Sequence, residues 1–284
     1  MSRIGITIGD NIESCCLECI YNGANIVQIF TQNPTQFYKS IIQINYENIK
    51  HECEINNIKV VIHGTFVVNL CRTLKDKSQQ NLIKLLIHDM YISSKLEAIG
   101  VVVHMGKNTK TMHITNEEAI NNYVDNVNYI LECTPNNSIL ILETGAGSGT
   151  EVCTEINELG KLRERIIQKD RVKFCIDTCH IFSSGYDLTN SEFIISLIDH
   201  IETCLKWDNV VLIHLNDSKT KLNSKIDRHA DIGCGEITTN YLEDFMTFIK
   251  FINNKEIPMV LETPSDVIPY NEQLNLINIY LDFF

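Results

Sequence analysis

The segment VKFCIDTCH, residues 172–180, carries the pattern that decides the fold of this chain. It opens as a short apolar run and closes on Asp177 and His180, residue types that strand interiors disfavour. We expect such a run to form a buried strand that delivers polar side chains at the point where it leaves the core.

The same pattern recurs on both sides of this segment. Five further apolar runs end on, or just before, a histidine or a glutamate: KVVIHG has His63, GVVVHMG has His104, SILILETG has Glu143, NVVLIHLND has His214 and PMVLET has Glu262. The short segment DRH adds Asp227 and His229. Six such runs in succession predict a ring of strands whose ends converge on one polar site. Imidazole and carboxylate ligands without thiolate suit zinc or manganese in an open catalytic centre.

Eight strands are expected in all, at residues 3–9, 25–31, 59–64, 100–106, 138–144, 172–178, 209–217 and 258–263. Nearly continuous apolar runs are typical of parallel strands buried on both faces. Segments with helical periodicity lie between them, for example residues 80–99, 117–134 and 191–207. This alternation of strand and helix predicts an α/β fold, a single (β/α)8 TIM barrel that spans residues 1–284 as one domain.

Catalytic groups in such barrels lie at the carboxyl ends of the strands. Six of the nine candidate ligands close strands three to eight: His63, His104, Glu143, Asp177, His214 and Glu262. The other three, His180, Asp227 and His229, are expected in the loops just after strands six and seven. Structural polar residues would have no reason to choose this end of every strand.

Composition bounds the class of protein. The chain has no run of eighteen apolar residues, so a membrane span is not expected. The N-terminal MSRIGITIGDN lacks the apolar core of a secretion signal, which predicts an intracellular, non-secreted protein. Eleven cysteines without metal-finger spacing are expected to be reduced and mostly buried. Cys15, Cys16 and Cys19 are expected to share a helical face, with a local bridge as the alternative.

The net charge of −12 argues at first against a nucleic-acid partner, because phosphates dominate such affinity. Three bound divalent ions would move the charge to about −6. Basic loops at residues 107–110 and 219–225 adjoin two of the expected ligand strands. Lys219 and Lys225 either contact phosphate or belong to a solvated loop.

Several residues near these runs are interpreted as structural. Gly145, Gly147 and Gly149 fit neither the dinucleotide nor the P-loop spacing, and are expected to let backbone pass close to Glu143. Burial is favoured over ligation for Cys175 and Cys179. The histidines without comparable placement are His51, His88, His113 and His200.

With these residues in view, the chain closely resembles the endonuclease IV family of apurinic/apyrimidinic (AP) endonucleases, zinc-dependent barrel enzymes of DNA repair. The resemblance runs from about residue 3 to residue 263. Its most specific segments are DTCHIFSSGYD (177–187), HLNDSK (214–219) and DRHADIGCGEI (227–237). FTQNPTQF (30–37), HGTFVVNL (63–70) and LETGAGSG (142–149) support it.

The resemblance implies three zinc ions per chain, with Mn2+ an option at one position. His63, His104 and Glu143 would hold the first, and Glu143 would bridge to a second held also by Asp177, His214 and Glu262. His180, Asp227 and His229 would hold the third. Glu262 and Glu143 are implied as catalytic, and metal ions so placed would neutralise the phosphodiester and generate hydroxide near neutral pH.

The implied reaction is hydrolysis of the phosphodiester 5′ to an abasic site in double-stranded DNA. It leaves a 3′-hydroxyl and a 5′-deoxyribose phosphate, with 3′-end trimming as an open addition, and the enzyme is expected to be a monomer. The abasic sugar would be flipped out of the duplex. The implied DNA contacts are Gln32, Thr35, Phe66, Tyr186 and Lys219.

This chain departs from the family at three places. Where the family usually has His-x-Pro-Tyr, it has His63-Gly64-Thr65-Phe66. Thr35 stands where an arginine often follows strand two, and Thr7 replaces a histidine often found in strand one. None of these changes removes a candidate ligand, so we expect them to alter DNA affinity more than chemistry.

Two other function classes are open to a barrel of this kind. A sugar isomerase or epimerase would need only a four-ligand centre such as Glu143, Asp177, His214 and Glu262. It would leave the remaining candidate ligands without a role. A non-catalytic DNA-binding barrel should have lost ligands, and none is visibly lost. Metal count separates the three: three ions for the nuclease, one or two for the isomerase, none for the scaffold.

Overall fold

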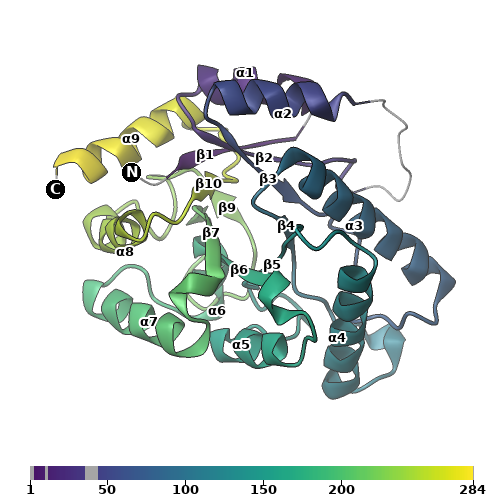
Figure 1. Cartoon of the computed structure of the whole chain (residues 1–284). Coiled ribbons are helices and arrows are strands. Elements are labelled where there is room, and N and C mark those ends of the chain that lie inside the picture. Colours follow the sequence, from purple (N-terminus) through teal and green to yellow (C-terminus); the bar gives the residue numbers. More distant parts are fainter. Residues whose placement is uncertain (1–2, 10–11, 36–43, 284) are drawn as a thin grey trace.

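The computed structural model describes residues 3–9, 12–35 and 44–283. Eight parallel strands close into a barrel in the spatial order β1-β10-β7-β6-β5-β4-β3-β2, with helices around the outside (Figure 1). The strands are β1 (Ile4–Ile8), β2 (Ile26–Ile29), β3 (Lys59–His63), β4 (Val101–Val103), β5 (Leu140–Glu143), β6 (Val172–Asp177), β7 (Val210–His214) and β10 (Met259–Leu261). The predicted TIM barrel is therefore confirmed.

Each barrel strand is followed by a helix along the chain. The helices are α1 (Cys15–Tyr21), α2 (Tyr46–Ile55), α3 (Lys77–Leu96), α4 (Asn116–Glu132), α5 (Ile156–Glu164), α6 (Thr178–Ser184), α7 (Ser191–Cys204), α8 (Leu242–Asn254) and α9 (Tyr270–Phe283). Short 3-10 turns lie at Ile12–Ser14, Lys110–Met112, Lys169–Arg171 and Trp207–Asn209. Within the described ranges, none of these helices combines the length and apolar character needed to cross a bilayer.

Local chemistry sets where the helices begin and end. Thr115 and Glu118 form a reciprocal capping box at the start of α4, and Asp76 caps α3 through the Ser78 N–H. Helix α3 ends at Leu96 and not at residue 99, because Glu97 adopts a left-handed conformation with φ of 50°. Helix α7 likewise stops at Cys204, short of the expected residue 207, since Lys206 has φ of 64°.

The expected strand 209–217 is shorter than predicted. Strand β7 ends at His214, and Asp217–Ser218 forms a separate strand, β8, that pairs antiparallel with β9 (His229–Ala230). The Asp217 carboxylate anchors this small hairpin by accepting backbone N–H groups of Ser218, Gly235 and Ile237. His229 therefore lies in a short strand of this hairpin, within the segment after strand seven where a loop was expected.

The barrel interior is packed with side chains from alternate residues of the strands. Seven of them form an apolar cluster of their own: Ile26, Val61, Val102, Ile141, Cys175, Leu212 and Val260. Because successive side chains point to opposite faces of a strand, the residue two positions later on each strand also points inward, nearer the carboxyl ends. The alternate residues on the outer face pack against the helices in the main core.

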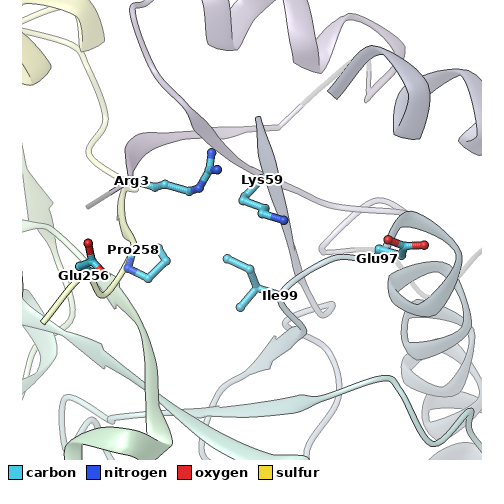
Figure 2. A pocket seen from close by; sticks show the side chains of 6 residues that line it. All are labelled: Arg3, Lys59, Glu97, Ile99, Glu256 and Pro258. Atoms are coloured by element: carbon cyan, nitrogen blue, oxygen red, sulfur yellow. The ribbon is translucent and has the colours of Figure 1, made fainter. Parts of the chain in front are cut away.

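The amino end of the barrel, opposite the candidate ligands, carries a pocket of about 470 Å³ (Figure 2). Its lining is Arg3, Lys59, Glu97, Ile99, Glu256 and Pro258. The Arg3 guanidinium donates to the Asn57 side chain at 2.7 Å, and Glu97 accepts from Lys50 at 2.6 Å. Arg3 is thus bonded to a neutral amide and Glu97 is paired with Lys50, and none of the nine candidate ligands lines this pocket.

Candidate metal centre

The nine candidate ligands meet at the carboxyl end of the barrel. Strand register sorts six of them into two interior layers, since alternate strands contribute to each layer of a TIM barrel. Strands β3, β5 and β7 place His63, Glu143 and His214 in the lower layer beside Thr7 of β1. His104, Asp177 and Glu262, which follow or end β4, β6 and β10, lie in the layer above.

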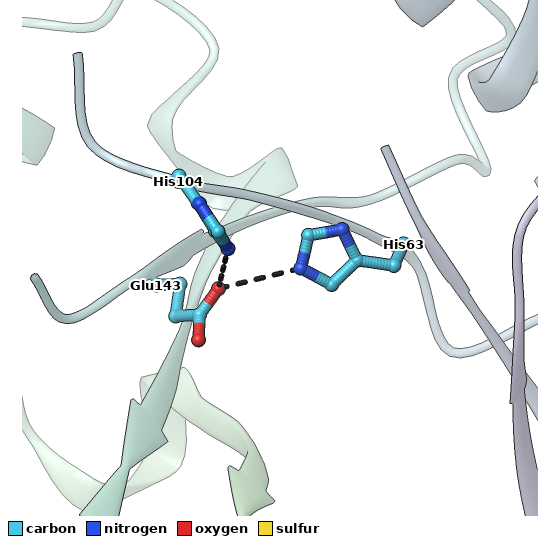
Figure 3. Close-up of side chains that lie close together, drawn as sticks. All are labelled: His63, His104 and Glu143. Atoms are coloured by element: carbon cyan, nitrogen blue, oxygen red, sulfur yellow. Dashed lines mark ion pairs between the residues drawn. The ribbon is translucent and has the colours of Figure 1, made fainter. Parts of the chain in front are cut away.

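A first group consists of His63, His104 and Glu143. The Nε2 atoms of His63 and His104 lie 3.5 and 3.1 Å from Oε2 of Glu143, so both imidazoles point at one carboxylate oxygen (Figure 3). Their three ligand atoms all lie within 4.8 Å of one another. His63 and Glu143 are buried, whereas the side chain of His104 is 38% exposed toward the mouth.

A middle group consists of Glu143, Asp177, His214 and Glu262. Nδ1 of His214 lies 2.9 Å from Oε1 of Glu143 and 3.0 Å from Oε2 of Glu262. Oδ2 of Asp177 is 3.9 Å from the same nitrogen. Glu143 therefore offers Oε2 to the first group and Oε1 to the middle group, the arrangement expected of a bridging carboxylate.

A third group consists of His180, Asp227 and His229. The two oxygens of Asp227 each lie 3.3 Å from one imidazole, that of His180 or that of His229. His180 occupies the first turn of α6, where its N–H donates to Oδ1 of Asp177, the helix cap. The expectation that His180 lies in a loop is wrong, because Asp177 starts a helix directly after β6.

Several atoms that face the centre of these groups make ion-pair contacts with one another but no hydrogen bond within the described part of the chain. Among the described residues, four of them are buried without a hydrogen bond: Nε2 of His63, of His180 and of His229, and Oε2 of Glu143. Buried polar atoms are rarely left unsatisfied. The Nδ1 atoms of the same three histidines face backbone carbonyls of Gly64, Thr144 and Glu262, at 2.7, 2.8 and 3.2 Å. Each ring is thereby oriented with Nε2 toward the group, which fits divalent cations bound by imidazole and carboxylate.

Charge pairing within the cluster shifts the pKa values of its members. Burial acts to raise the pKa of Glu262, but the His214 imidazole outweighs it and holds this pKa at about 2. Burial acts to lower the pKa of His229, while Asp177 and Asp227 raise it to about 9. For Asp177 burial dominates and the pKa is raised. Bound cations would take over the role of the protonated imidazoles and displace their protons.

Two cysteines adjoin this centre. Cys175 lies in the apolar interior layer, and Cys179 lies within reach of Asp177 and His229. Both are fully buried, and burial raises the pKa of each thiol to about 12. The thiol form is a poor metal ligand, in keeping with the interpretation of both residues as buried apolar groups.

The glycine-rich loop after β5 serves a different partner from the one expected. Oε2 of Glu151 accepts the N–H groups of Gly147 and Ser148, at 2.8 and 3.2 Å. A Cβ at Gly145 would fall 2.6 Å from the same carboxylate oxygen. The close approaches of Gly145 and Gly147 are therefore to Glu151, and not to Glu143 as expected.

The residues expected to contact DNA differ in their exposure and in the hydrogen bonds that they make within the chain. Phe66 is 47% exposed and stacks on His104, with ring centres 5.2 Å apart. Its N–H donates to the Pro34 carbonyl, which ties the loop after β3 to the loop after β2. Thr35 and Lys219 are exposed. Residues 36 and 37 of the FTQNPTQF segment lie outside the described residues.

Other candidates are already bonded within the chain. Gln32 donates to the buried Asp89 carboxylate at 3.2 Å. The Tyr186 hydroxyl donates to Glu155 at 3.0 Å and accepts the Ile156 N–H. Lys225, near the same loop, donates its ammonium to the Ser184 carbonyl at 2.6 Å.

Three residues that support the cluster were missed from the sequence. Thr144 accepts the Asp177 N–H through its hydroxyl, and its carbonyl holds His180. The Asn216 amide donates to Oδ2 of Asp177 at 2.7 Å and accepts the Glu262 N–H at 2.9 Å. Gln28 contacts His214 and Glu262 from inside the barrel. The available signal was an uncharged polar residue within or next to an apolar run.

Known proteins that are similar to this chain have the same barrel fold. A family model described as Xylose isomerase-like TIM barrel matches residues 19–278. A protein of Acanthamoeba polyphaga mimivirus named as an endonuclease 4 is 34% identical over 277 residues, covering 91% of this chain and 86% of the relative.

Two solved structures share the fold. Endonuclease IV from Thermus thermophilus matches with a TM-score of 0.82 at 23% identity, covering 98% of both chains. A D-tagatose 3-epimerase-like protein matches with a TM-score of 0.74 at 13% identity, covering 98% of this chain and 97% of that one. At these identities both likenesses concern the barrel architecture alone.

Proposed function

Because the chain belongs to the endonuclease IV family of AP endonucleases, we propose that it is a metal-dependent nuclease that incises DNA at abasic sites. The observation that carries this proposal is the convergence of nine imidazole and carboxylate side chains in three groups at one barrel mouth. Four of their inward-facing atoms lack any hydrogen bond among the described residues, as expected of atoms reserved for cations.

The three groups define three cation positions, which we assign to zinc, with manganese as an alternative at one of them. His63, His104 and Glu143 hold the first. Glu143 is shared with the second, which Asp177, His214 and Glu262 complete. His180, Asp227 and His229 hold the third. Nε2 of His229 lies 3.6 Å from Oδ2 of Asp177, which supports a third position next to the second.

Divalent ions at these positions supply charge neutralisation at the phosphodiester, activation of the attacking water and stabilisation of the leaving oxygen. Among the residues, Glu143 directs Oε2 at the first group and Oε1 at the middle group, so it would contribute to both positions. Glu262 presents Oε2 to the middle group and orients the attacking water. We therefore assign Glu262 and Glu143 as the catalytic carboxylates.

The reaction proposed is hydrolysis of the phosphodiester 5′ to the abasic sugar, which leaves a 3′-hydroxyl and a 5′-deoxyribose phosphate. Trimming of damaged 3′ ends could use the same centre. The unpaired sugar is flipped into the mouth, which costs least where no base is stacked. Phe66 and Thr35 are exposed on the joined loops after β3 and β2, and with Lys219 they face the duplex. Gln32 and Tyr186 add DNA contacts to the extent that their hydrogen bonds within the chain leave them free.

We extend the proposal to the state of the protein. The whole chain, residues 1–284, acts as one catalytic domain and as a monomer. All eleven cysteines are free thiols, and Cys15, Cys16 and Cys19 are buried on α1, which supports the proposed location in a reducing compartment.

A sugar epimerase is the rival supported by likeness of fold. It would use the middle group alone, which gives no reason for the unsatisfied nitrogens of His63, His180 and His229. Elemental analysis combined with cleavage of a duplex oligonucleotide carrying one abasic site separates the two functions. We expect about three zinc ions per chain and a cut 5′ to the abasic site. One or two ions without cleavage would contradict the proposal and support the epimerase.

A further inference from the structure

One polar residue lies in the apolar layer directly beneath the candidate ligands. The register places Gln28 of β2 with Val102, Cys175 and Val260, the inward residues of β4, β6 and β10. Gln28 is fully buried. A glutamine in this position loses its hydration, so its amide must be satisfied by the protein.

Both ends of the Gln28 amide are bonded to candidate ligands. Its nitrogen donates to Oε1 of Glu262 at 2.6 Å and to the Thr7 hydroxyl at 3.1 Å. Its oxygen lies 2.9 Å from Nε2 of His214. Gln28 therefore joins two members of the middle group from below, at residues 186 and 234 positions away along the chain.

These contacts fix which way the amide points. A flipped amide would bring its oxygen to 2.6 Å from a carboxylate oxygen, and both atoms are acceptors. Glu262 thus holds the nitrogen of Gln28 on its own side. The oxygen is left facing His214, where it can only accept a hydrogen bond.

The orientation of Gln28 decides the state of the His214 ring. Since the amide oxygen accepts, Nε2 of His214 must carry a hydrogen. In neutral imidazole the lone pair is then on Nδ1, the atom that faces Glu143 and Glu262. His63, His180 and His229 have the opposite arrangement, with Nδ1 on a backbone carbonyl and Nε2 toward the group.

We propose that Gln28 is a positioning residue of the middle group, which sets the ring nitrogen that His214 offers and the oxygen that Glu262 offers. With Oε1 of Glu262 held by the amide, only Oε2 is directed at the group. This inference rests on the proposed metal centre but not on the substrate. Hydrogen bonds of this kind to metal ligands are worth about 10–100-fold in metal affinity or activity.

The first experiment reads the proton on His214 directly. In 15N-histidine-labelled protein loaded with Zn2+, long-range 1H–15N correlation spectra distinguish the ring nitrogen that carries hydrogen. We expect Nε2–H for His214 and Nδ1–H for His63, His180 and His229. A hydrogen on Nδ1 of His214 would overturn the inference, whatever the activity of the enzyme.

The second experiment uses Gln28→Leu, which keeps the bulk of the side chain and removes both hydrogen-bonding ends. Gln79→Leu is the matched control, because Gln79 is also fully buried and donates to the Asn69 carbonyl, away from the centre. Competition with a chelator measures Zn2+ affinity, and unfolding of both metal-free variants measures the purely structural loss.

We expect Gln28→Leu to weaken one of the three zinc positions by about 10–100-fold and to lower kcat while KM for abasic duplex stays unchanged. Gln79→Leu should keep all three affinities. Wild-type affinities in Gln28→Leu, or equal losses in both variants, would make Gln28 a packing residue. Failure of the proposed function looks different, since the wild-type protein itself would then bind no Zn2+ or leave abasic DNA uncut.

Discussion

Glu262 contacts residues from several parts of the candidate centre. Its Oε2 faces His214, its backbone N–H donates to Asn216, and its carbonyl lies 3.2 Å from Nδ1 of His229. A change confined to its charge therefore tests the chemistry without removing the packing around it.

We predict that Glu262→Gln nearly abolishes incision while the barrel stays folded. The amide keeps the size of the side chain but loses the charge that binds a cation and orients water. Turnover on abasic duplex and far-UV circular dichroism check this, with the exposed Glu243→Gln on α8 as control. A variant that keeps more than about a tenth of wild-type turnover would contradict the assignment, since that loss represents only ~1.4 kcal/mol.

A substitution at His229 tests whether the candidate ligands form three separate groups. Its Nε2 lies 3.3 Å from Asp227, in the third group, and it is not a member of the other two groups. We predict that His229→Ala loses one metal ion and retains the other two, with slower turnover. Elemental analysis of the purified variant decides the matter. Full occupancy, or loss of every ion, would be inconsistent with three separable groups.

Phe66 tests recognition of the substrate. Its ring is half-exposed over His104, so it can stack into the gap left by a missing base. We predict that Phe66→Ala weakens binding to abasic duplex by ~1–3 kcal/mol more than binding to intact duplex, with the slope of log affinity against log salt unchanged. Titrations of both duplexes at several salt concentrations measure this.

Two results would change the interpretation of Phe66. Equal weakening on both duplexes would identify it as a packing residue. A drop in zinc content would show that its contact with His104 supports the metal centre and not the DNA.

At the scale of elements, the connections that enter the strands carry backbone strain. Lys206, between α7 and β7, has φ of 64° and ψ of 125°, and Asn57, Glu97 and Glu256 also have positive φ. A side chain with a Cβ is disfavoured in these conformations, whereas glycine adopts them freely. The alternation of strand and helix thus depends on short turns built from residues that are poorly suited to them.

We predict that Lys206→Gly raises the free energy of unfolding by about 0.5–1 kcal/mol, because the exposed lysine side chain contributes less than the strain it imposes. Lys206→Ala is the matched control and should give no gain, since its Cβ keeps the strain. Denaturant unfolding measures both. Equal stabilisation by alanine and glycine would show that the backbone conformation is not the cause.

At the scale of the whole molecule, the centre draws its ligands from six strands and from the segments after β6 and β7. Cations bound there would link most of the ring of strands. Their loss leaves carboxylates and imidazoles that pair with one another, as Glu143 does with His214 at 2.9 Å. The barrel core itself is apolar and independent of these pairs.

We predict that chelation lowers the melting temperature but leaves the protein folded at room temperature. Each ion at a hundred times its dissociation constant stabilises the folded state by about 2.7 kcal/mol. Differential scanning calorimetry with and without chelator, repeated after adding back Zn2+, measures the shift. An unchanged melting temperature would argue against tight binding, and unfolding on chelation would show that the apolar core is not sufficient.

The sequence by itself determined the barrel and the membership of the candidate ligand set. Apolar runs and helical periodicity are local patterns, and parallel strands in a closed ring bring all their carboxyl ends to one edge. A polar residue at the end of each run, such as His63 or Glu143, then necessarily lies close to the others. The departures concern boundaries, for example β7 at His214 and α7 at Cys204, where a side-chain anchor or a positive φ ends the element.

Only the tertiary structure decided how the ligand side chains are held. It shows that His180 lies in the first turn of a helix, that the glycine loop binds Glu151, and that Gln28 joins Glu262 to His214 across 234 and 186 positions of sequence. Which nitrogen of an imidazole faces the centre depends on the partner of the other nitrogen. That partner comes from a distant strand or a neighbouring carbonyl, so no pattern within one segment can reveal it.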